Sequence, residues 1–558
     1  MGKAKPHALP PRHIDWGELP PPFTVESILE RAAQKWPDRV ALDFYGTEHT
    51  FRDLHTLALQ AARGFAALGV GPGVNVALHL PNTPHFVVCF FGILIAGGCV
   101  VNCSPLAGII ETRSQLIDSG AQVLVTGNWT TQYRQLRRLV GTGALRALVA
   151  CSLLDFLAQP QARELVSAVP DPDPTSSGEI AFTALLALDT RMARLERATL
   201  EEELAVLQYT GGTTGEPKAA MLTHANFAAA LHSSQRLSAG RTAQALKELV
   251  ILPLYHILGL GLMLRAFWAG FELIMHMRFD AQRVLSDIQS KKINLIAAVP
   301  AMFARLAAHP GFGSCDFSTL MGYASAGAPL TTHVRGCLEE RVELMMRDSY
   351  GLTETTGVGT VPAPMRDGKI GGVPAPYAHM EVVDLETGLS VLPAGEVGEL
   401  CFTGPHVMKG YWNRKEETAE AFRGGRFHTG DIGSIDAAGY VTVTERKKDI
   451  IFTGGHNVYP RNVERAIQEH PAVAEVAVIG IPHLDFGEVC KAFVVLKPGH
   501  EPFSFVELCG FLTQRLASYE IPLDMEIRAE LPRTSVSKVS KVALLSEVVR
   551  SQIGVGNG

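Results

Sequence analysis

The feature that most constrains the fold is a ten-residue loop, Tyr209-Thr-Gly-Gly-Thr-Thr-Gly-Glu-Pro-Lys218. An apolar stretch of strand length, residues 204–210, leads into it, and Thr223 after it is a suitable helix N-cap. Glycines let backbone N–H groups point into a concavity, and threonine hydroxyls and a lysine add donors and positive charge. The pattern predicts a polyphosphate-binding loop rather than a plain surface turn. It differs from a Walker A loop, because Lys218 stands three places after Gly215 and no Ser or Thr follows it.

Length and composition indicate a large globular protein with more than one core. The chain has 558 residues, of which 47% are hydrophobic and 19% charged, so we expect several subdomains. A net charge of −6 argues against a nucleic-acid-binding surface. The nine cysteines show no CxxC pair, which predicts reduced thiols rather than disulfides or a zinc site.

Two segments bear on membranes and targeting. Residues 1–22 are rich in proline and lack the apolar stretch of a signal peptide. Residues 86–101 are apolar, but they are short for a membrane span and Gly97-Gly98 interrupts them. They predict a buried helix followed by a buried strand. We therefore expect a cytoplasmic protein without a transmembrane segment, and leave open a peripheral membrane contact and a homodimer.

Strand and helix patterns alternate through about residue 170, which indicates layered α/β structure. A short α/β pattern resumes after residue 449, with helices expected near 461–470 and 506–515 and strands at 473–479 and 492–496. A hairpin turn is expected at residues 436–439.

Five further strings stand out downstream of the loop. Taken singly, each has an ordinary structural explanation: a lone histidine among apolar residues usually belongs to the core, and an Asp in a turn or a run of charges usually faces solvent. The strings are Leu252-Pro-Leu-Tyr-His-Ile-Leu-Gly-Leu260, Ser325-Ala-Gly-Ala-Pro-Leu330, Asp348-Ser-Tyr-Gly-Leu-Thr-Glu-Thr355, His428-Thr-Gly-Asp431 with residues 445–460, and Leu531-Pro-Arg-Thr-Ser-Val-Ser-Lys-Val-Ser-Lys541.

In this order, and together with the loop, the strings resemble the adenylate-forming superfamily of acyl-CoA synthetases, luciferases and peptide-synthetase adenylation domains. Within it the likeness is greatest to bacterial medium- and long-chain fatty acyl-CoA synthetases. The resemblance implies a large N-terminal domain, residues 1–447, built of layered α/β subdomains and a β-barrel-like subdomain. It also implies a small mobile α+β C-terminal domain, residues 448–558.

The resemblance also implies roles in ATP binding and catalysis. Tyr350 would stack on adenine, Asp431 and Arg446 would hold the ribose, and Glu354 with Thr210 would hold Mg²⁺. Lys538, Glu354, Thr353 and Lys218 would be the catalytic residues. The remaining ATP-binding residues would be Gly211, Gly212, Thr213, Thr214, Gly215, Gly327, Ala328 and Gly351.

For the acid and the thiol, the resemblance implies two more sites. His256, Leu258, Leu260, Tyr323 and Gly351 would line the acyl pocket. Lys448 would be the hinge between the domains, and Gly454 and Gly455 would lie beside the pantetheine arm of coenzyme A.

The identity of pocket residues narrows the substrate. Ile257 and Leu258 stand where peptide-synthetase domains carry an acid for the substrate amine, and burying an unpaired ammonium is costly. Gly351 stands where acetate-specific members carry a tryptophan. Both points favour a medium- or long-chain fatty acid over an amino acid or acetate.

The predicted activity is an acid–thiol ligase that forms acyl-AMP from ATP and then acyl-CoA. Three positions depart from the superfamily pattern: Ser537 and Ala219 replace glycines and Lys541 replaces an arginine. An aryl-acid CoA ligase, a ligase that loads a carrier protein, and a non-catalytic acyl or nucleotide sensor remain open.

Overall fold

The structure is a computed structural model that describes residues 17–166, 178–190, 199–210, 217–238, 245–325, 332–361, 363–364, 370–453, 456–483, 486–534 and 538–555. These residues form two compact units. Unit 1 comprises the described residues up to Thr210, Pro217–Met380 and Phe402–Phe427, and unit 2 comprises Glu381–Cys401 and those from His428 onward. The predicted domain boundary between residues 447 and 448 stays a prediction.

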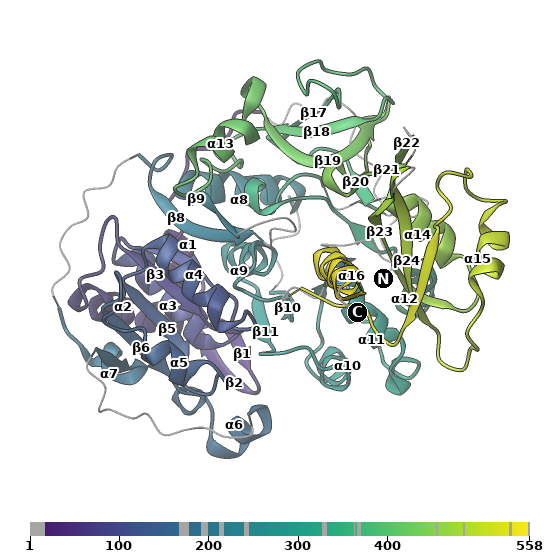
Figure 1. Cartoon of the computed structure of the whole chain (residues 1–558). Helices are drawn as coiled ribbons and strands as arrows, with labels where there is room; N and C mark the ends of the chain where they lie inside the picture. Colours follow the sequence, from purple (N-terminus) through teal and green to yellow (C-terminus); the bar gives the residue numbers. More distant parts are fainter. Residues whose placement is uncertain are drawn as a thin grey trace. The chain divides into compact units, whose positions relative to one another are not determined.

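Unit 1 contains a mainly parallel sheet of seven strands, whose last two strands flank the predicted phosphate loop (Figure 1). All neighbours are parallel except the last pair, β8 and β9, which form an antiparallel hairpin. In spatial order the strands are β7 (Glu179–Ala181), β6 (Ala147–Cys151), β5 (Val123–Gly127), β3 (Asn75–His79), β4 (Cys99–Asn102), β8 (Leu204–Thr210) and β9 (Lys218–Thr223).

Unit 1 also contains a second sheet, of eight strands. Its inner strands are parallel, and one antiparallel strand closes each edge. The order is β15 (Ala363–Pro364), β14 (Arg347–Asp348), β13 (Gly322–Ser325), β12 (Leu295–Ala298), β10 (Lys247–Val250), β11 (Glu272–Met275), β1 (Val40–Phe44) and β2 (Thr47–Thr50).

Helices link the strands of unit 1. They are α1 (Ser27–Lys35), α2 (Phe51–Ala67), α3 (Pro84–Ile95), α4 (Ile109–Ser119), α5 (Tyr133–Arg137), α6 (Gln159–Leu165), α7 (Phe182–Ala187), α8 (His224–Ser238), α9 (Ile257–Ala269), α10 (Ala281–Ser290), α11 (Pro300–Ala307), α12 (Thr332–Val342) and α13 (Lys415–Ala421).

The apolar segment 86–101 folds as its sequence predicts, into the buried helix α3 and the buried strand β4. Helix α3 packs closely on α2, because a Cβ at Gly92 would lie 2.8 Å from the Cβ of Ala61. Burial of each large apolar side chain of α3 contributes roughly 1.5–3 kcal/mol. Among the described helices, none is both long and apolar enough to cross a membrane.

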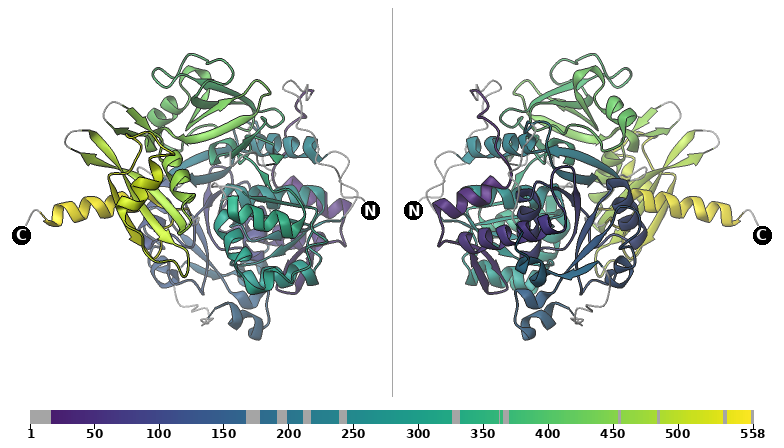
Figure 2. Two further views of the ribbon diagram at one scale, coloured as in Figure 1. Left: turned by 90° about the vertical axis from the view of Figure 1, so that its right-hand side faces the viewer. Right: turned by 90° about the vertical axis from the view of Figure 1, so that its left-hand side faces the viewer.

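Unit 2 ends in a sheet flanked by helices, as expected for the C-terminal α/β pattern. Strands β22, β21, β24 and β23 are neighbours in this order, and β25 pairs with β24. Helix α16 runs on to the end of the described chain (Figure 2). The elements are β21 (Ile451–Thr453), β22 (His456–Val458), α14 (Pro460–Gln468), β23 (Val473–His483), β24 (Gly487–Leu496), α15 (Phe505–Leu512), β25 (Asp524–Arg528) and α16 (Lys541–Val555).

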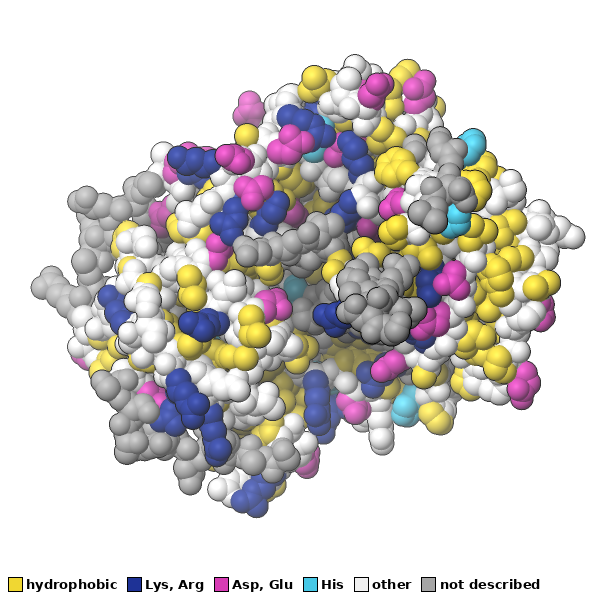
Figure 3. All heavy atoms as spheres, viewed as in Figure 1, with side chains coloured by type: hydrophobic (Ala, Val, Ile, Leu, Met, Phe, Trp, Pro, Cys, Tyr) yellow, Lys and Arg dark blue, Asp and Glu magenta, His cyan; other side chains and the backbone are white. Residues whose placement is uncertain are grey.

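The chain passes between the units inside strands β17 (His379–Val383), β18 (Gly398–Thr403) and β19 (Phe427–Ile435). Within unit 2, β19 and β20 (Val441–Arg446) form the expected hairpin, closed where the Gly439 N–H donates to the Asp436 carbonyl. The short strand β16 (Ile370–Gly372) belongs to unit 1. The mixed α/β fold with several sheets confirms the predicted fold class. On the face in Figure 3, acidic and basic side chains are interspersed among apolar ones.

Candidate functional site

The β8–β9 hairpin places two predicted site residues directly opposite each other. Its register pairs Thr210 with Lys218, and the Thr210 hydroxyl donates to the Lys218 carbonyl at 3.3 Å. The hairpin therefore closes the base of the predicted phosphate loop. The loop residues themselves lie outside the described part of the chain: Gly211, Gly212, Thr213, Thr214 and Gly215.

Tyr411 joins Lys218 to Glu354. The Lys218 Nζ lies 5.3 Å from the centroid of the Tyr411 ring, within cation–π range. The Tyr411 hydroxyl donates a hydrogen bond to Glu354 Oε1 at 2.9 Å. The structure thus brings a predicted phosphate-binding cation and a predicted metal-binding carboxylate to one phenol.

Backbone hydrogen bonds hold Tyr411 beside β9. The Met221 N–H donates to the Gly410 carbonyl at 2.8 Å, and the Trp412 N–H donates to the Ala219 carbonyl at 2.9 Å. These bonds add residues 410–412 to the edge of the hairpin as a further extended segment. The position of the phenol is therefore set by main-chain geometry.

Glu354 lies in a short 3₁₀ turn, Thr353–Thr355, anchored to the same segment. The Met408 N–H donates to the Glu354 carbonyl at 2.7 Å, and the Leu352 N–H donates to the Thr355 hydroxyl at 3.0 Å. Thr353 and Glu354 are both half-buried. The turn keeps them adjacent, as the sequence predicts, and their ligand roles stay predictions.

Tyr350 and Gly351 lie where backbone segments approach closely. The Tyr350 ring is buried and stacks on Phe402 with centroids 5.9 Å apart. A Cβ on Gly351 would lie 2.6 Å from the Gly357 carbonyl oxygen, so a side chain at this position would displace the Gly357 backbone. The predicted adenine-side residues Gly327 and Ala328 lie outside the described residues.

Apart from Gly351, the predicted acyl-pocket residues lie at helix α9 and on strand β13 of unit 1. His256 is the N-cap residue of α9 and is half-buried, as is Leu258, whereas Leu260 is fully buried. Tyr323 on β13 lies in the core beneath the eight-stranded sheet, where its hydroxyl donates to the Leu344 carbonyl at 2.9 Å. Burial raises the pKa of Tyr323. Their pocket roles stay predictions.

In unit 2 the predicted ribose-binding residues form an ion pair. Asp431 on β19 lies opposite Arg446 on β20, and Arg446 Nε is 2.7 Å from Asp431 Oδ1. The Asp431 carboxylate is almost fully buried, and the backbone N–H of Asp431 donates to the Thr429 hydroxyl at 2.9 Å. The pair is a short charge-assisted hydrogen bond with a fixed direction.

A second buried acid, Glu399 on β18, supports this turn. Its Oε1 accepts a hydrogen bond from the Gly430 N–H at 3.2 Å, and its Oε2 lies 3.2 Å from Lys447 Nζ and 3.3 Å from His428 Nδ1. Burial alone would raise the pKa of Glu399, but Lys447 and His428 lower it. Glu399 therefore stays ionised and links the predicted ribose turn to the residue before Lys448.

Lys538 ends a closed turn in unit 2. The Thr534 N–H donates to its carbonyl at 2.7 Å, and its side chain is exposed. Crowding by nearby protein atoms lowers the pKa of Lys538, Arg446 lowers it further, and Asp431 opposes both. Lys538 thus lies within electrostatic reach of the predicted ribose pair.

The remaining predicted residues of unit 2 are only partly described. Lys448 lies in the exposed turn after β20. Gly454 and Gly455 lie outside the described residues, as does Ser537.

Sequence reasoning missed Tyr411 and Glu399. Tyr411 belongs to Gly410-Tyr-Trp-Asn413, an aromatic pair between two positions with positive φ, and this pattern could have marked a fixed turn. Glu399 stands in an apolar strand, where a lone acid signals a partner. Neither pattern indicates which residue the side chain contacts.

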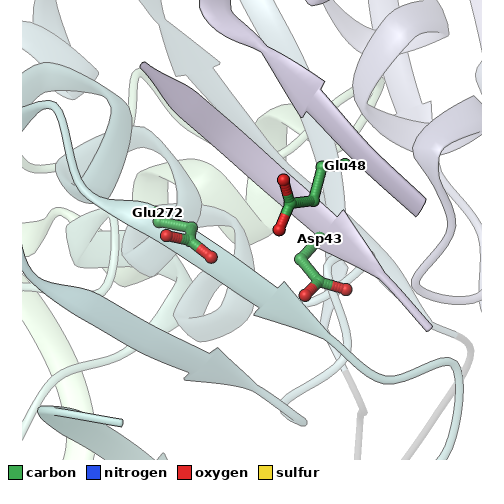
Figure 4. A group of neighbouring side chains, drawn as sticks. All are labelled: Asp43, Glu48 and Glu272. Atoms are coloured by element: carbon green, nitrogen blue, oxygen red, sulfur yellow. The ribbon is translucent and has the colours of Figure 1, made fainter. Parts of the chain in front are cut away.

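A separate acidic group lies on the eight-stranded sheet (Figure 4). Carboxylate oxygens of Asp43, Glu48 and Glu272 come within 4.8 Å of one another. Lys291 Nζ lies 2.5 Å from Asp43, and Lys247 Nζ lies 3.0 Å from Glu272. These two cations pair with the buried Asp43 and the half-buried Glu272, and Glu48 is exposed, so ion pairing accounts for much of the group's charge.

The chain is similar to known proteins over most of its length. The chain matches the AMP-binding enzyme family over residues 29–412 and the AMP-binding enzyme C-terminal domain over residues 462–538. A long-chain-fatty-acid–CoA ligase of Bacillus subtilis is 36% identical over 540 residues, covering 95% of this chain and 96% of the relative.

Two solved structures are similar over almost the whole chain. An anthranilate CoA ligase in complex with anthranoyl-AMP has a TM-score of 0.81 at 26% identity and covers 96% of this chain and 99% of its own. The o-succinylbenzoate coenzyme A synthetase of Bacillus subtilis in complex with ATP and a magnesium ion has a TM-score of 0.75 at 28% identity, covering 93% and 99%. The resemblance stated from the sequence is confirmed, and the chain belongs to the AMP-binding enzyme family.

Proposed function

We propose that the protein is an ATP-dependent acyl-CoA ligase that activates a medium- or long-chain fatty acid as acyl-AMP. The observation that carries the proposal is the convergence of Lys218 and Glu354 on Tyr411. A cation and a carboxylate held side by side suit a triphosphate and its metal ion. The relatedness to a long-chain-fatty-acid–CoA ligase over nearly the full chain supports the reaction class.

The donor set of unit 1 fits ATP with Mg²⁺. Glu354 and Thr210 supply the carboxylate and hydroxyl oxygens that a hard cation prefers, and Tyr411 engages one carboxylate oxygen of Glu354. A bound Mg²⁺ would offset the charge of the phosphates. Lys218 adds a fixed positive charge, and Asp431 with Arg446 would orient the ribose.

The reaction needs positioning and charge stabilisation more than covalent help from the protein. A carboxylate oxygen attacks the α-phosphorus of ATP, and pyrophosphate leaves. The thiol sulfur of coenzyme A then attacks the acyl carbonyl of the mixed anhydride, and AMP leaves with the bridging oxygen. Lys538 would stabilise the charge that builds at the α-phosphate.

The chemistry of the predicted pocket favours an apolar chain. Leu258 and Leu260 on α9 are apolar, and each buried methylene contributes about 0.8 kcal/mol to binding. An aryl-acid ligase is the second candidate, favoured by the similarity to the anthranilate CoA ligase. Loading of a carrier protein and a sensor role are weaker candidates. We place the enzyme in the cytoplasm, where ATP and coenzyme A are available and its nine cysteines stay reduced.

The test is pyrophosphate release with acids from acetate to palmitate and with benzoate, each with and without coenzyme A. We expect rates to rise from acetate towards octanoate or beyond, and acyl-CoA to form only with coenzyme A. Turnover of acetate as good as that of octanoate would reject the substrate class. Pyrophosphate without any thioester would point to a carrier-protein ligase, and no release with any acid would point to a sensor.

Chain length can be probed at Gly261, one helical turn after Leu258 on α9. An added Cβ there meets no atom within 4 Å, whereas a side chain at Gly351 would displace the Gly357 backbone. Gly261→Leu should reduce turnover of the longest acids first, and Gly313→Leu, which also meets no neighbour, is the control. An unchanged length profile in Gly261→Leu would remove this face of α9 from the pocket.

A further inference from the structure

Glu445 is a buried carboxylate three residues before the predicted hinge, Lys448. It lies on β20, and its side chain is only 1% exposed. A carboxylate in such a place is costly unless it is paired and hydrogen-bonded. Its partners therefore indicate what it holds.

The partners of Glu445 lie on both sides of the predicted hinge. On the near side, its Oε1 accepts a hydrogen bond from the Arg446 N–H at 3.0 Å. On the far side, its Oε2 accepts one from the Arg461 N–H at 2.6 Å, and Arg461 Nε lies 3.7 Å from Oε1. Burial raises the pKa of Glu445, while Lys541 and Arg461 lower it.

The far-side contact caps a helix. Arg461 is the second residue of α14, whose own N-cap residue, Tyr459, makes no side-chain cap. The first N–H groups of a helix lack partners within it and favour a negative charge nearby. Glu445 supplies that charge from outside the helix, across the predicted hinge.

Helix α14 is in turn tied to the segment that carries Lys538. Glu464 on α14 pairs with Lys541 at the start of α16, with Oε1 and Nζ 2.9 Å apart. Lys541 follows Lys538 by three residues, and the Ser540 N–H donates to the Pro532 carbonyl at 2.7 Å, which closes the Lys538 turn. Lys541 stands where the superfamily pattern has an arginine, and its ammonium forms the ion pair with Glu464.

We propose that Glu445 is a positioning residue that latches the C-terminal domain in the orientation for adenylate formation. By capping α14 across the hinge, it holds Lys538 within electrostatic reach of Asp431 and Arg446. The inference rests on the proposed function, because it assigns Glu445 to the first of the two half-reactions. Release of this contact would accompany the change to thioester formation.

Glu445→Gln tests the latch, because it keeps the shape and one acceptor oxygen but removes the charge. We expect pyrophosphate release to fall about tenfold, as for loss of a charged hydrogen-bond partner, while thioester formation from supplied acyl-AMP is unchanged or faster. Glu248→Gln is the matched control: Glu248 is equally buried and pairs with Arg265 within unit 1. This control should affect both half-reactions alike.

A second readout needs no activity. Trypsin cleaves after lysine, and Lys447 and Lys448 lie at the predicted hinge. Glu445→Gln should be cut there several times faster than wild type, and Glu248→Gln should not.

The two readouts separate the possible failures. Equal loss of both half-reactions in Glu445→Gln, or an unchanged cleavage rate at the hinge, would overturn the latch. If wild type releases no pyrophosphate with any acid, the proposed function fails, and the cleavage rates alone decide whether Glu445 holds the hinge.

Discussion

The two groups of predicted site residues manage charge in opposite ways. In unit 1, a neutral phenol stands between Lys218 and Glu354, touching the cation with its ring and the carboxylate with its hydroxyl. In unit 2, Asp431 and Arg446 pair directly at 2.7 Å. A phenol satisfies both groups without cancelling either charge, so both can meet a charged ligand. A direct ion pair has little net charge, but it fixes the direction of its hydrogen bonds.

The difference fits the ligand parts assigned to each group. A triphosphate and its metal ion carry large opposite charges, which require cations and carboxylates that keep their own charge. A ribose is neutral and is recognised by oriented hydrogen bonds to its hydroxyls. We infer that unit 1 supplies the charge for the nucleotide and that the Asp431–Arg446 pair of unit 2 supplies orientation.

The largest expected effect tests unit 2. There Lys538 is a cation that does not belong to the Asp431–Arg446 pair. Lys538→Ala should slow adenylate formation by about 10²-fold or more, as for loss of one charge-stabilising donor. Thioester formation from supplied acyl-AMP should be largely spared. Lys448→Pro, which fixes φ at the predicted hinge, should do the reverse. Equal loss of both half-reactions in both variants would contradict this division.

The next largest expected effect tests the link from Tyr411 to Glu354 in unit 1. Glu354→Gln keeps the shape but removes the charge, and we expect activity to fall about tenfold and the Mg²⁺ requirement to rise. Tyr411→Phe keeps the ring against Lys218 and removes only the hydroxyl on Glu354, so its effect should be smaller. Magnesium titrations of pyrophosphate release distinguish the two. Unchanged titration curves in Glu354→Gln would remove Glu354 from the metal site.

Some of the features behind these expectations could be predicted from the sequence, and others could not. Local signals were sufficient for β8, for α3, and for α8, where the Thr223 hydroxyl accepts the Asn226 N–H at 3.2 Å. The link from Lys218 through Tyr411 to Glu354 joins three distant segments, and no local pattern encodes such pairing. The capping of α14 by Glu445 escaped notice for the same reason.

The steric role of Gly351 was also hidden. The sequence shows a missing side chain, which we interpreted as pocket space. The structure shows that the Gly357 carbonyl approaches this position closely, which is a second reason for glycine here, and the pocket role of Gly351 stays a prediction.

The last expected effect concerns stability rather than reaction rate and lies within unit 1. Burial lowers the pKa of His79 and of His406 to about 4. Between about pH 6.5 and 4 the unfolded chain binds protons at these histidines and the folded chain does not. The free energy of unfolding should therefore fall as the pH drops through this window, by on the order of 2–3 kcal/mol for each histidine.

Denaturant unfolding at a series of pH values measures this slope. His406→Gln should flatten it, and replacement of the exposed His500 by Gln should not. Equal slopes in all three proteins would show that His406 titrates alike in both states.

Isotope transfer tests the central claim most directly, because an acyl-AMP intermediate dictates where each oxygen goes. Octanoate labelled with ¹⁸O in both carboxylate positions is incubated with ATP, Mg²⁺, coenzyme A and the enzyme, and the products are analysed by mass spectrometry. Attack on the α-phosphorus should leave one ¹⁸O in AMP and one in the thioester carbonyl, with none in pyrophosphate. Unlabelled AMP, or label in pyrophosphate or phosphate, would contradict the account.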